Sequence, residues 1–233
     1  MALKKFKLND GLEITVYKRR GSRSIRLSLA ANGEVRISLP VWVPYRAGVA
    51  FAESRLDWIT EQRPVPLVLA EGQLIGKQHR LHYRVSARAS KPSSRLAAGQ
   101  VIVTHPLGAV SSDPNVQSAA EKAAIRALRQ EATAVLPDRL RALARQHKFS
   151  YTDVTIKQLT SRWGSCDQQQ HIALNLFLMQ LPWELIDYVL LHELVHTEHL
   201  HHGSDFWEAL EAVAPGAKQL RAAIGKHKPV VLR

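Results

Sequence analysis

Five of the eleven histidines fall in one short segment, residues 192–202. Two of them belong to His192-Glu193-Leu194-Val195-His196, which has the H-E-x-x-H pattern. Residues four apart lie on one face of a helix, about 6 Å apart along its axis, so two imidazoles can bind one metal ion. Glu193, next to the first imidazole, can reach a water molecule on the metal rather than the metal itself. The spacing therefore predicts a site for metal-assisted hydrolysis.

A third ligand is needed, because a catalytic zinc ion usually takes three protein side chains and keeps one position for water. We expect His202, because it follows a turn that Gly203 can shape and so reaches the metal from another direction. His199 would lie in line with the other two imidazoles if the helix continued that far, and three side chains in a row cannot form three corners of a tetrahedron. The side chains that remain as alternatives are His199, His201, Glu208 and Glu211.

The apolar pattern of the second half predicts the elements that position this motif. They are a helix over 116–147 with a kink or break at Pro137, strands over 154–159 and 171–177 that pair antiparallel, a helix from Pro182 to about His199, and a last helix from Ser204 or Asp205 to Pro215-Gly216. The sequence Asp205-x-x-Glu208 fits a capping box at the start of that last helix.

The first half is rich in alternating sequences that are typical of strands. The elements expected there are strands over 12–17, 24–29, 34–39, 67–69, 82–85 and 100–104, a helix over 44–60 ended by Pro64 and Pro66, a loop over 89–94 and a linker over 108–114. The dipeptide Asn32-Gly33 predicts a hairpin between the second and third strands. No internal repeat is evident, so we expect none.

The second half resembles the YgjP-like family, a group of predicted zinc metallopeptidases related to the SprT-like and WLM groups. The segments that carry the resemblance are Ser161-Arg162-Trp163-Gly164-Ser165-Cys166, Asn175, Pro182, Ile186-Asp187-Tyr188-Val189, the H-E-L-V-H motif and Phe206-Trp207. The resemblance extends over almost the whole chain, because the first half also fits the usual layout of the family.

This resemblance implies an α+β fold, in which an N-terminal β-rich domain precedes a gluzincin-like helical metallopeptidase domain with a short antiparallel sheet. It also implies a zinc ion on His192, His196 and His202, with Glu193 catalytic. The chain departs from the family at His201-His202-Gly203, where Asn-His-Ser is common. The His-Gly pair is similar to SprT-like proteins.

Positive charge is concentrated in the first half of the chain. Residues 1–110 hold 18 basic and 7 acidic residues, whereas residues 111–233 hold 14 and 13. We therefore expect two domains, a basic β-rich domain over 1–110 and a catalytic domain over 111–233. The basic domain predicts nucleic acid or a nucleotide as a partner, although a solubilising surface explains the charge equally well, since no aromatic motif for base stacking accompanies it.

Length and composition restrict the class of protein. At 233 residues with 45% hydrophobic residues, the chain can bury a sizeable core, and wholesale disorder is excluded. No apolar segment approaches the roughly 18 residues of a membrane helix, and no signal peptide is evident at the N-terminus. A single cysteine, Cys166, cannot form an internal disulfide and fits a reducing compartment. We expect a cytoplasmic protein without a membrane partner.

The function predicted is that of a zinc-dependent metallopeptidase acting on protein or peptide substrates. Glu193 takes a proton from water and passes it to the leaving amine. The oxyanion-binding residue stays open among Tyr188, Arg162 and His201. Two alternatives are a metal-dependent nucleotide phosphohydrolase and a nucleic-acid-associated protein with a structural zinc ion, although the first lacks a glycine-rich phosphate loop and the second needs a fourth ligand.

The segment Arg162-Trp163-Gly164-Ser165-Cys166 permits two interpretations. Strand 171–177 beside it can form a cleft edge to which an extended peptide adds as a further strand. Alternatively Trp163 is a core residue, Gly164 is a turn residue and Cys166 has no role, and we favour this structural interpretation for Trp163 and Cys166.

Overall fold

A computed structural model describes residues 3–30, 33–62 and 68–227. Contacts within the chain divide it into two compact units, Met1–Leu67 and Val68–Arg233. This division lies far from residue 110, where the charge distribution suggests a boundary. The reason is that the second sheet of the chain packs on the long helix that follows it. Among the described residues, no helix combines the length and hydropathy needed to cross a membrane.

The first unit is a four-stranded sheet covered by two short helices. Its elements are β1 Leu3–Lys7, β2 Glu13–Lys18, β3 Arg26–Leu29, β4 Val35–Leu39, α1 Tyr45–Glu53 and α2 Leu56–Gln62. The strand order is β1-β2-β4-β3, with β2 and β4 parallel. Alternate residues such as Ile14, Val16 and Ile37 point inward, where Ala52 and Ile59 of the helices complete the core. The single helix expected over 44–60 is divided at Ser54, and Pro64 and Pro66 lie outside the described residues.

The second unit begins with another four-stranded sheet. Its strands are β5 Leu74–Ile75, β6 His79–Ser86, β7 Ser93–Ala97 and β8 Gln100–Pro106, in the order β5-β6-β8-β7. The end of the loop expected over 89–94 therefore belongs to a strand, which begins at Ser93. A strand was also expected over 67–69, but residues 68–69 are irregular. Residue 67 lies outside the described residues. Leu81, Val101 and Val103 face the core, and register places Arg80, Arg84 and Arg95 on the opposite face.

The two four-stranded sheets repeat one topology, so the expectation of no internal repeat is wrong. In each, the two central strands are parallel and each outer strand is antiparallel to its neighbour. The sequences agree at the second hairpin, where Leu29-Ala30-Ala31-Asn32-Gly33-Glu34-Val35 corresponds to Leu96-Ala97-Ala98-Gly99-Gln100-Val101. Gly33 and Gly99 both have positive φ, 72° and 74°, which side chains disfavour. The pairing of β3 with β4 confirms the predicted hairpin.

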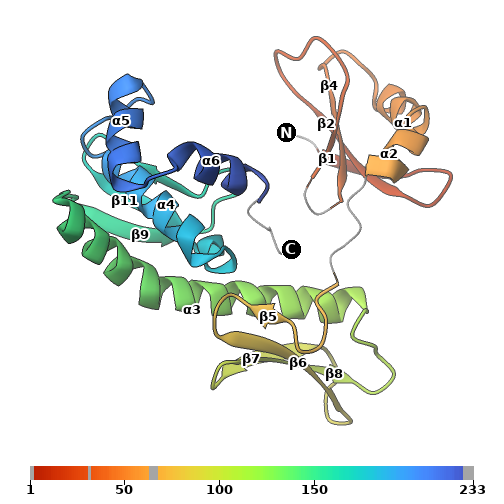
Figure 1. Ribbon diagram of the computed structural model, residues 1–233. Helices are drawn as coiled ribbons and strands as arrows, with labels where there is room; N and C mark the ends of the chain where they lie inside the picture. Colours follow the sequence, from red (N-terminus) through yellow and green to blue (C-terminus); the bar gives the residue numbers. More distant parts are fainter. Residues whose placement is uncertain (1–2, 31–32, 63–67, 228–233) are drawn as a thin grey trace. The chain divides into compact units, whose positions relative to one another are not determined.

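Helix α3, Pro114–His147, connects this sheet to the C-terminal part of the same unit (Figure 1). Asp113 caps its first turn by accepting a hydrogen bond from the Asn115 N–H. The helix is continuous across Pro137, so the expected alternative of a break into two helices is wrong. Leu136 and Leu140 on either side are fully buried. The segment expected to be a linker over 108–114 is thus a short connection ending in a helix cap.

Glu131 of α3 anchors the hairpin between β5 and β6. Its carboxylate accepts hydrogen bonds from the backbone N–H groups of Lys77, Gln78 and His79, and the His79 ring lies 2.6 Å away. A Cβ atom at Gly76, which has φ of 68°, would lie 2.3 Å from the same carboxylate. Lys77 continues from this anchor to the backbone carbonyl of Leu181, just before the helix that carries the histidine motif. The anchor therefore joins the second sheet to the candidate site.

We expect Glu131→Ala to lower the free energy of unfolding by about 3–5 kcal/mol, because several buried N–H groups lose their acceptor together. Urea or thermal unfolding measures the change. The matched control is Gln130→Ala, which removes an exposed side chain from the same helix. An equal change in both variants would show that Glu131 is no anchor.

The C-terminal part consists of a small sheet and four short helical elements. They are β9 Asp153–Lys157, β10 Gly164–Cys166, β11 His171–Asn175, the 3-10 helix η1 Leu176–Gln180, α4 Trp183–Val195, α5 Ser204–Val213 and α6 Ala217–Gly225. The antiparallel pair expected from β9 and β11 is wrong. These two strands are parallel, and the short β10 is antiparallel to β11 on its other side.

Three further expectations about this part need correction. The sheet order β10-β11-β9 makes β11 the central strand, so β11 has no free edge for a peptide. Gly203 is the N-cap of α5 and no side chain caps it, so the predicted capping box is not formed. Finally, the helix that begins at Ser204 ends at Val213, just before Pro215-Gly216 as expected, but it is not the last one, because α6 follows with Gly216 in the left-handed conformation at its N-cap.

Candidate metal centre and active site

Three imidazoles converge at the C-terminal end of α4. His202 Nε2 lies 3.1 Å from His192 Nε2, and His196 Nε2 lies 3.2 Å from the same atom. Among the described residues, His192, His196 and His202 form the one group of three or more histidine, cysteine or acidic side chains whose ligand atoms lie within 4.8 Å of one another. We call this group the histidine triad. The structure thus brings together the three side chains that the sequence suggests as ligands.

The end of α4 explains why His199 is not part of the triad. The helix ends at Val195, and His196 is its C-cap, so His199 is no longer in line with His192. Instead, the backbone carbonyl of His199 accepts a hydrogen bond from His196 Nδ1 at 2.9 Å. A proton on Nδ1 leaves the Nε2 lone pair directed at the triad, which is how ligand histidines are commonly oriented. His201 is exposed and outside the triad.

Phe206 of α5 holds the three rings in place. It is fully buried, and its ring centroid lies 4.9 Å from that of His192 and 4.6 Å from those of His196 and His202. Trp207 stacks on His202 with centroids 5.8 Å apart. These ring contacts fix the loop that brings His202 back toward α4.

The triad suits a cation because its imidazoles are uncharged. Burial lowers the pKa of His192 to about 3, with a further contribution from the other two histidines, and burial also lowers the pKa values of His196 and His202. Nitrogen lone pairs that face one another repel unless a proton or a metal ion lies between them. Three neutral nitrogen donors are also a ligand set that zinc commonly takes in catalytic sites.

Glu193 lies beside the triad in a nearly water-free environment. Its side chain is 5% exposed, and burial raises the pKa of the carboxyl to about 8, an effect that nearby Arg162 opposes. Its Oε2 atom is buried and has no hydrogen-bond partner within the described part of the chain. A carboxyl with a pKa near neutrality and an oxygen without a partner is able to accept and return a proton.

Gly164 makes room for this carboxyl and is a strand residue in β10, which corrects the expectation of a turn residue. A Cβ atom at this position would lie 2.6 Å from Glu193 Oε1 and 2.8 Å from Glu193 Cγ. Asn175 positions the segment before β10, because its buried amide group donates to the carbonyls of Leu159 and Arg162. Both residues contact segments that are distant in the sequence, so no local sequence pattern predicts their roles in the site.

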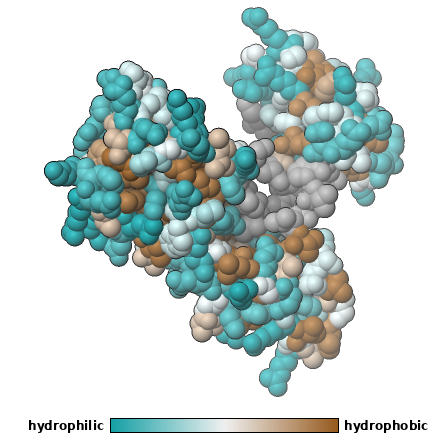
Figure 2. Space-filling model, in the orientation of Figure 1, coloured by the Kyte–Doolittle hydropathy of each residue, from teal (hydrophilic) through white to brown (hydrophobic). Residues whose placement is uncertain are grey.

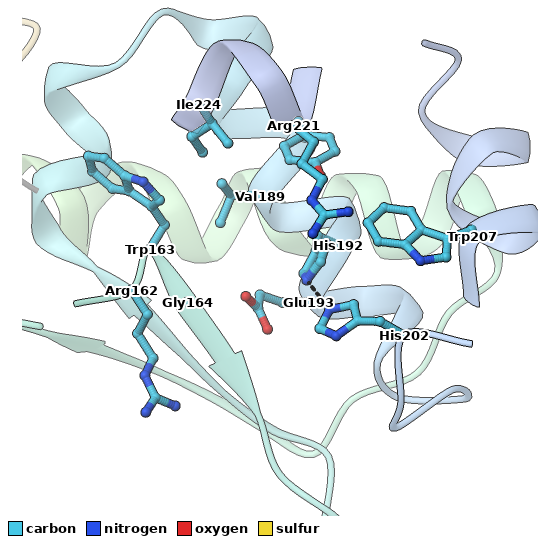
Figure 3. A pocket seen from close by; sticks show the side chains of 11 residues that line it. Arg162, Trp163, Gly164, Val189, His192, Glu193, His202, Trp207, Arg221 and Ile224 are labelled. Carbon is cyan, nitrogen blue, oxygen red and sulfur yellow. Dashed lines mark hydrogen bonds between the residues drawn. The ribbon is translucent and has the colours of Figure 1, made fainter. Parts of the chain in front are cut away.

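A cavity of about 520 Å³ opens beside the triad and Glu193. Figure 3 shows that α4 and α6 supply one apolar side, Val189 and Ile224, which Trp163 extends. Arg221 of α6 and Trp207 of α5 lie on the other side, next to His192 and His202. On the surface drawn in Figure 2, apolar side chains are visible among polar ones on the part that carries α4 and α6. Sequence reasoning missed Arg221 and Ile224, because it ended the last helix before them.

The remaining side chains named by the sequence lie around this cavity or beside it. Tyr188 and Arg162, two of the three candidates for binding an oxyanion, line the cavity, whereas His201 is not among the lining residues. Trp163 is half-buried and packs against the core while also lining the cavity. Cys166 is half-buried, and burial raises the pKa of its thiol to about 11, so it is a poor nucleophile at neutral pH.

The geometry of the site defines a class of protein, a metal-dependent hydrolase that carries an H-E-x-x-H motif on a helix. Residues 23–227 match the family model described as YgjP-like, metallopeptidase domain. The chain therefore belongs to the YgjP-like family and is a metallopeptidase, as its sequence resemblance predicts.

Two solved structures are similar to part of the chain. One is the metallopeptidase zymogen of Pyrococcus abyssi abylysin, with 27% identity and a TM-score of 0.36, covering 40% of this chain and 94% of that chain. The other is the metallopeptidase zymogen of Methanocaldococcus jannaschii jannalysin, with 20% identity and a TM-score of 0.35, covering 39% of this chain and 93% of that chain. None of the curated proteins compared with the chain matches it.

Proposed function

We propose that the protein is a zinc peptidase in which the histidine triad holds the ion and Glu193 transfers the proton. The observation that carries this proposal is the convergence of three uncharged imidazole nitrogens beside a buried carboxyl group. Zinc fits the donors, because ligands about 2.0–2.1 Å from a tetrahedral ion lie about 3.3 Å from one another. The two short distances within the triad, 3.1 and 3.2 Å, are close to this value.

A zinc ion held by the histidine triad would supply Lewis-acid chemistry, which lowers the pKa of water to about 7 and polarises a carbonyl group. Glu193 Oε2 accepts the proton of the attacking water, since this oxygen has no partner among the described residues. The protonated carboxyl then donates to the nitrogen of the leaving amine, which restores the carboxylate. Gly164 and Asn175 keep the carboxyl in reach of both positions by fixing the strand behind it.

A protein or peptide substrate fits the strand arrangement beside the cavity. β10 is an edge strand, and Gly164 at its start lines the cavity. An extended peptide that adds to this edge has its backbone hydrogen-bonded by β10 and its side chains alternately in the cavity and in solvent. The apolar side formed by Trp163, Val189 and Ile224 suits an apolar side chain of the substrate.

Nucleic acid or a nucleotide remains a proposed partner of the basic residues 1–110. The arrangement that supports it is the outward face of the second sheet, which carries Arg80, Arg84 and Arg95 in neighbouring rows. Such binding would weaken steeply with added salt. A closed, structural zinc site is less suited to the triad, since within the described ranges no fourth side chain joins it. We also propose a cytoplasmic location, and the observation that supports it is the single cysteine, which fits a reducing compartment.

Alanine variants of each histidine test the ligand assignment. We expect His202→Ala to lose zinc, measured as metal per protein after dialysis, because the remaining two imidazoles bind the ion far more weakly. His199→Ala and His201→Ala are the matched controls, three residues and one residue away in the same loop, and we expect both to retain one zinc ion per chain. Retention of zinc by His202→Ala together with its loss in His199→Ala, Glu208→Ala or Glu211→Ala would contradict the assignment.

A further inference from the structure

Arg221 is a charged side chain of the cavity to which the proposed reaction gives no role. It lies on α6, and Figure 3 shows its guanidinium next to the His192 ring and the indole of Trp207. The guanidinium carbon lies 4.8 Å from the centroid of the Trp207 ring. Its charge contributes to the lowered pKa values of His192 and His202, which places it within electrostatic reach of the triad.

A guanidinium that stacks on an indole keeps its hydrogen-bonding edge free. Stacking uses the face of the group, whereas its N–H donors lie in the plane and match the two oxygens of a carboxylate. The same chain shows the complete arrangement elsewhere. Arg139 lies 4.8 Å from the Trp183 ring centroid, and its edge binds the Asp187 carboxylate through two nitrogens, one of them 2.6 Å from Asp187 Oδ2.

Arg221 stacks on a tryptophan as Arg139 does, but within the described residues it has no carboxylate partner. Over residues 3–30, 33–62 and 68–227, no acidic side chain forms an ion pair with it. Glu193 is the single acidic residue among those that line the cavity, and its Oε1 is turned toward Gly164. Arg162 is a second positively charged residue of the lining. The cavity thus holds a prepared carboxylate-binding group and an excess of positive charge.

We infer that Arg221 binds a carboxylate of the substrate, so that the enzyme prefers peptides with an acidic group close to the scissile bond. This inference rests on the proposed function. The carboxylate has two sources in a peptide, an Asp or Glu side chain or the free C-terminus. Both present two oxygens that can accept hydrogen bonds from the N–H donors of Arg221.

Binding to the Glu193→Gln protein tests the inference without turnover. The probes are acetylated, amidated peptides of Ala and Leu with a single Glu or Gln at each position in turn, and the same Gln peptides with a free C-terminal carboxylate. Calorimetry should show tighter binding of at least one carboxylate peptide than of its neutral counterpart, by about tenfold to hundredfold for a charge-assisted pair. Glu peptides and free C-termini are separate arms, so the result identifies the source.

Removing the guanidinium should remove this preference. Arg221→Gln in the Glu193→Gln protein should bind the Glu and Gln peptides alike, and Arg221→Glu should reverse the preference toward a peptide with Lys at that position. Lys218→Ala is the matched control, because it removes one positive charge from an exposed position of the same helix outside the cavity lining. We expect it to keep the preference.

Kinetics separate this role from stabilisation of the reacting carbonyl. In the protein with Glu193 intact, Arg221→Gln should raise KM for the carboxylate peptide and remove its advantage in kcat/KM over the neutral peptide, with the difference carried by KM rather than by kcat. An equal fall in kcat for all peptides, or no preference in the parent protein, would overturn the inference while zinc binding and hydrolysis stand. Absence of both zinc binding and hydrolysis would instead refute the proposed function.

Discussion

Glu193→Gln is expected to keep its zinc ion and to lose hydrolysis by about 10²–10⁴-fold or more. Glutamine has the shape of glutamate and fits the space that Gly164 leaves, so the histidine triad and the strand behind it stay in place. What changes is the atom that faces the water, because an amide accepts no proton at neutral pH. The effect is large because the same group both activates the water and protonates the leaving amine.

The measurement combines metal content with the rate of peptide hydrolysis. Glu184→Gln, an exposed glutamate in the first turn of the same helix, is the control and should match the parent protein in both. Near-normal turnover in Glu193→Gln at one zinc ion per chain would show that another group carries the proton. Loss of zinc from this variant would instead mean that the carboxyl supports the metal centre.

The core of the candidate site could be predicted from sequence because its spacing is local. His192 and His196 are four residues apart on one helix, and helix geometry alone brings their rings together. His202 required one further argument, that a third ligand must come from beyond a turn. The structure shows how the turn is made, with α4 ending at Val195 and the His199 carbonyl bonded to His196.

The other side of the site depends on contacts between distant segments. Gly164 and Glu193 are neighbours in space and far apart in sequence, and a glycine in a strand looks like any other turn or bulge residue. Arg221 lies on a helix whose apolar stripe is short and begins directly after Pro215-Gly216, a pair that normally ends a helix. A cavity lined from both segments carries no periodic pattern along the chain.

The relative direction of β9 and β11 could not be predicted from the sequence either. Alternation predicts that residues 153–157 and 171–175 are strands, but it is the same for parallel and antiparallel pairing. The direction follows from the connection between them, which contains β10 as a third strand. Two strands that follow each other directly would form an antiparallel hairpin. Here β10 lies between them in the sequence and pairs antiparallel with β11, and β9 and β11 are parallel.

The duplicated sheet topology leaves only a short and interrupted match in the sequence, which is why no repeat is evident there. The matching segments differ by one inserted residue, Asn32, which shifts the register between the first and second copies. Both copies also place basic residues on outward strand positions, such as Arg36 and Arg84. The charge boundary near residue 110 therefore follows the end of the second copy, whereas the packing boundary follows the end of the first.

Gly164→Ala is expected to reduce hydrolysis by about a hundredfold while zinc stays bound. The added Cβ would lie 2.6 Å from Glu193 Oε1 and 2.8 Å from Glu193 Cγ, so the carboxyl must move by roughly 1 Å to restore normal contact distances. A displacement of this size at a catalytic group commonly costs about 10²-fold in rate. None of the triad histidines is among the atoms nearest to the added methyl group.

A double variant shows whether the effect passes through Glu193. If Gly164 acts only by leaving room for that carboxyl, Gly164→Ala should cost nothing further in the Glu193→Gln background, since the proton-accepting group is already gone. Gly225→Ala is the matched control, because a Cβ there meets no atom within 4 Å. Additive losses in the double variant, or loss of zinc from Gly164→Ala alone, would show that the glycine supports the fold of the sheet or the metal centre. Strong non-additivity would make Gly164 a positioning residue for the carboxyl that transfers the proton.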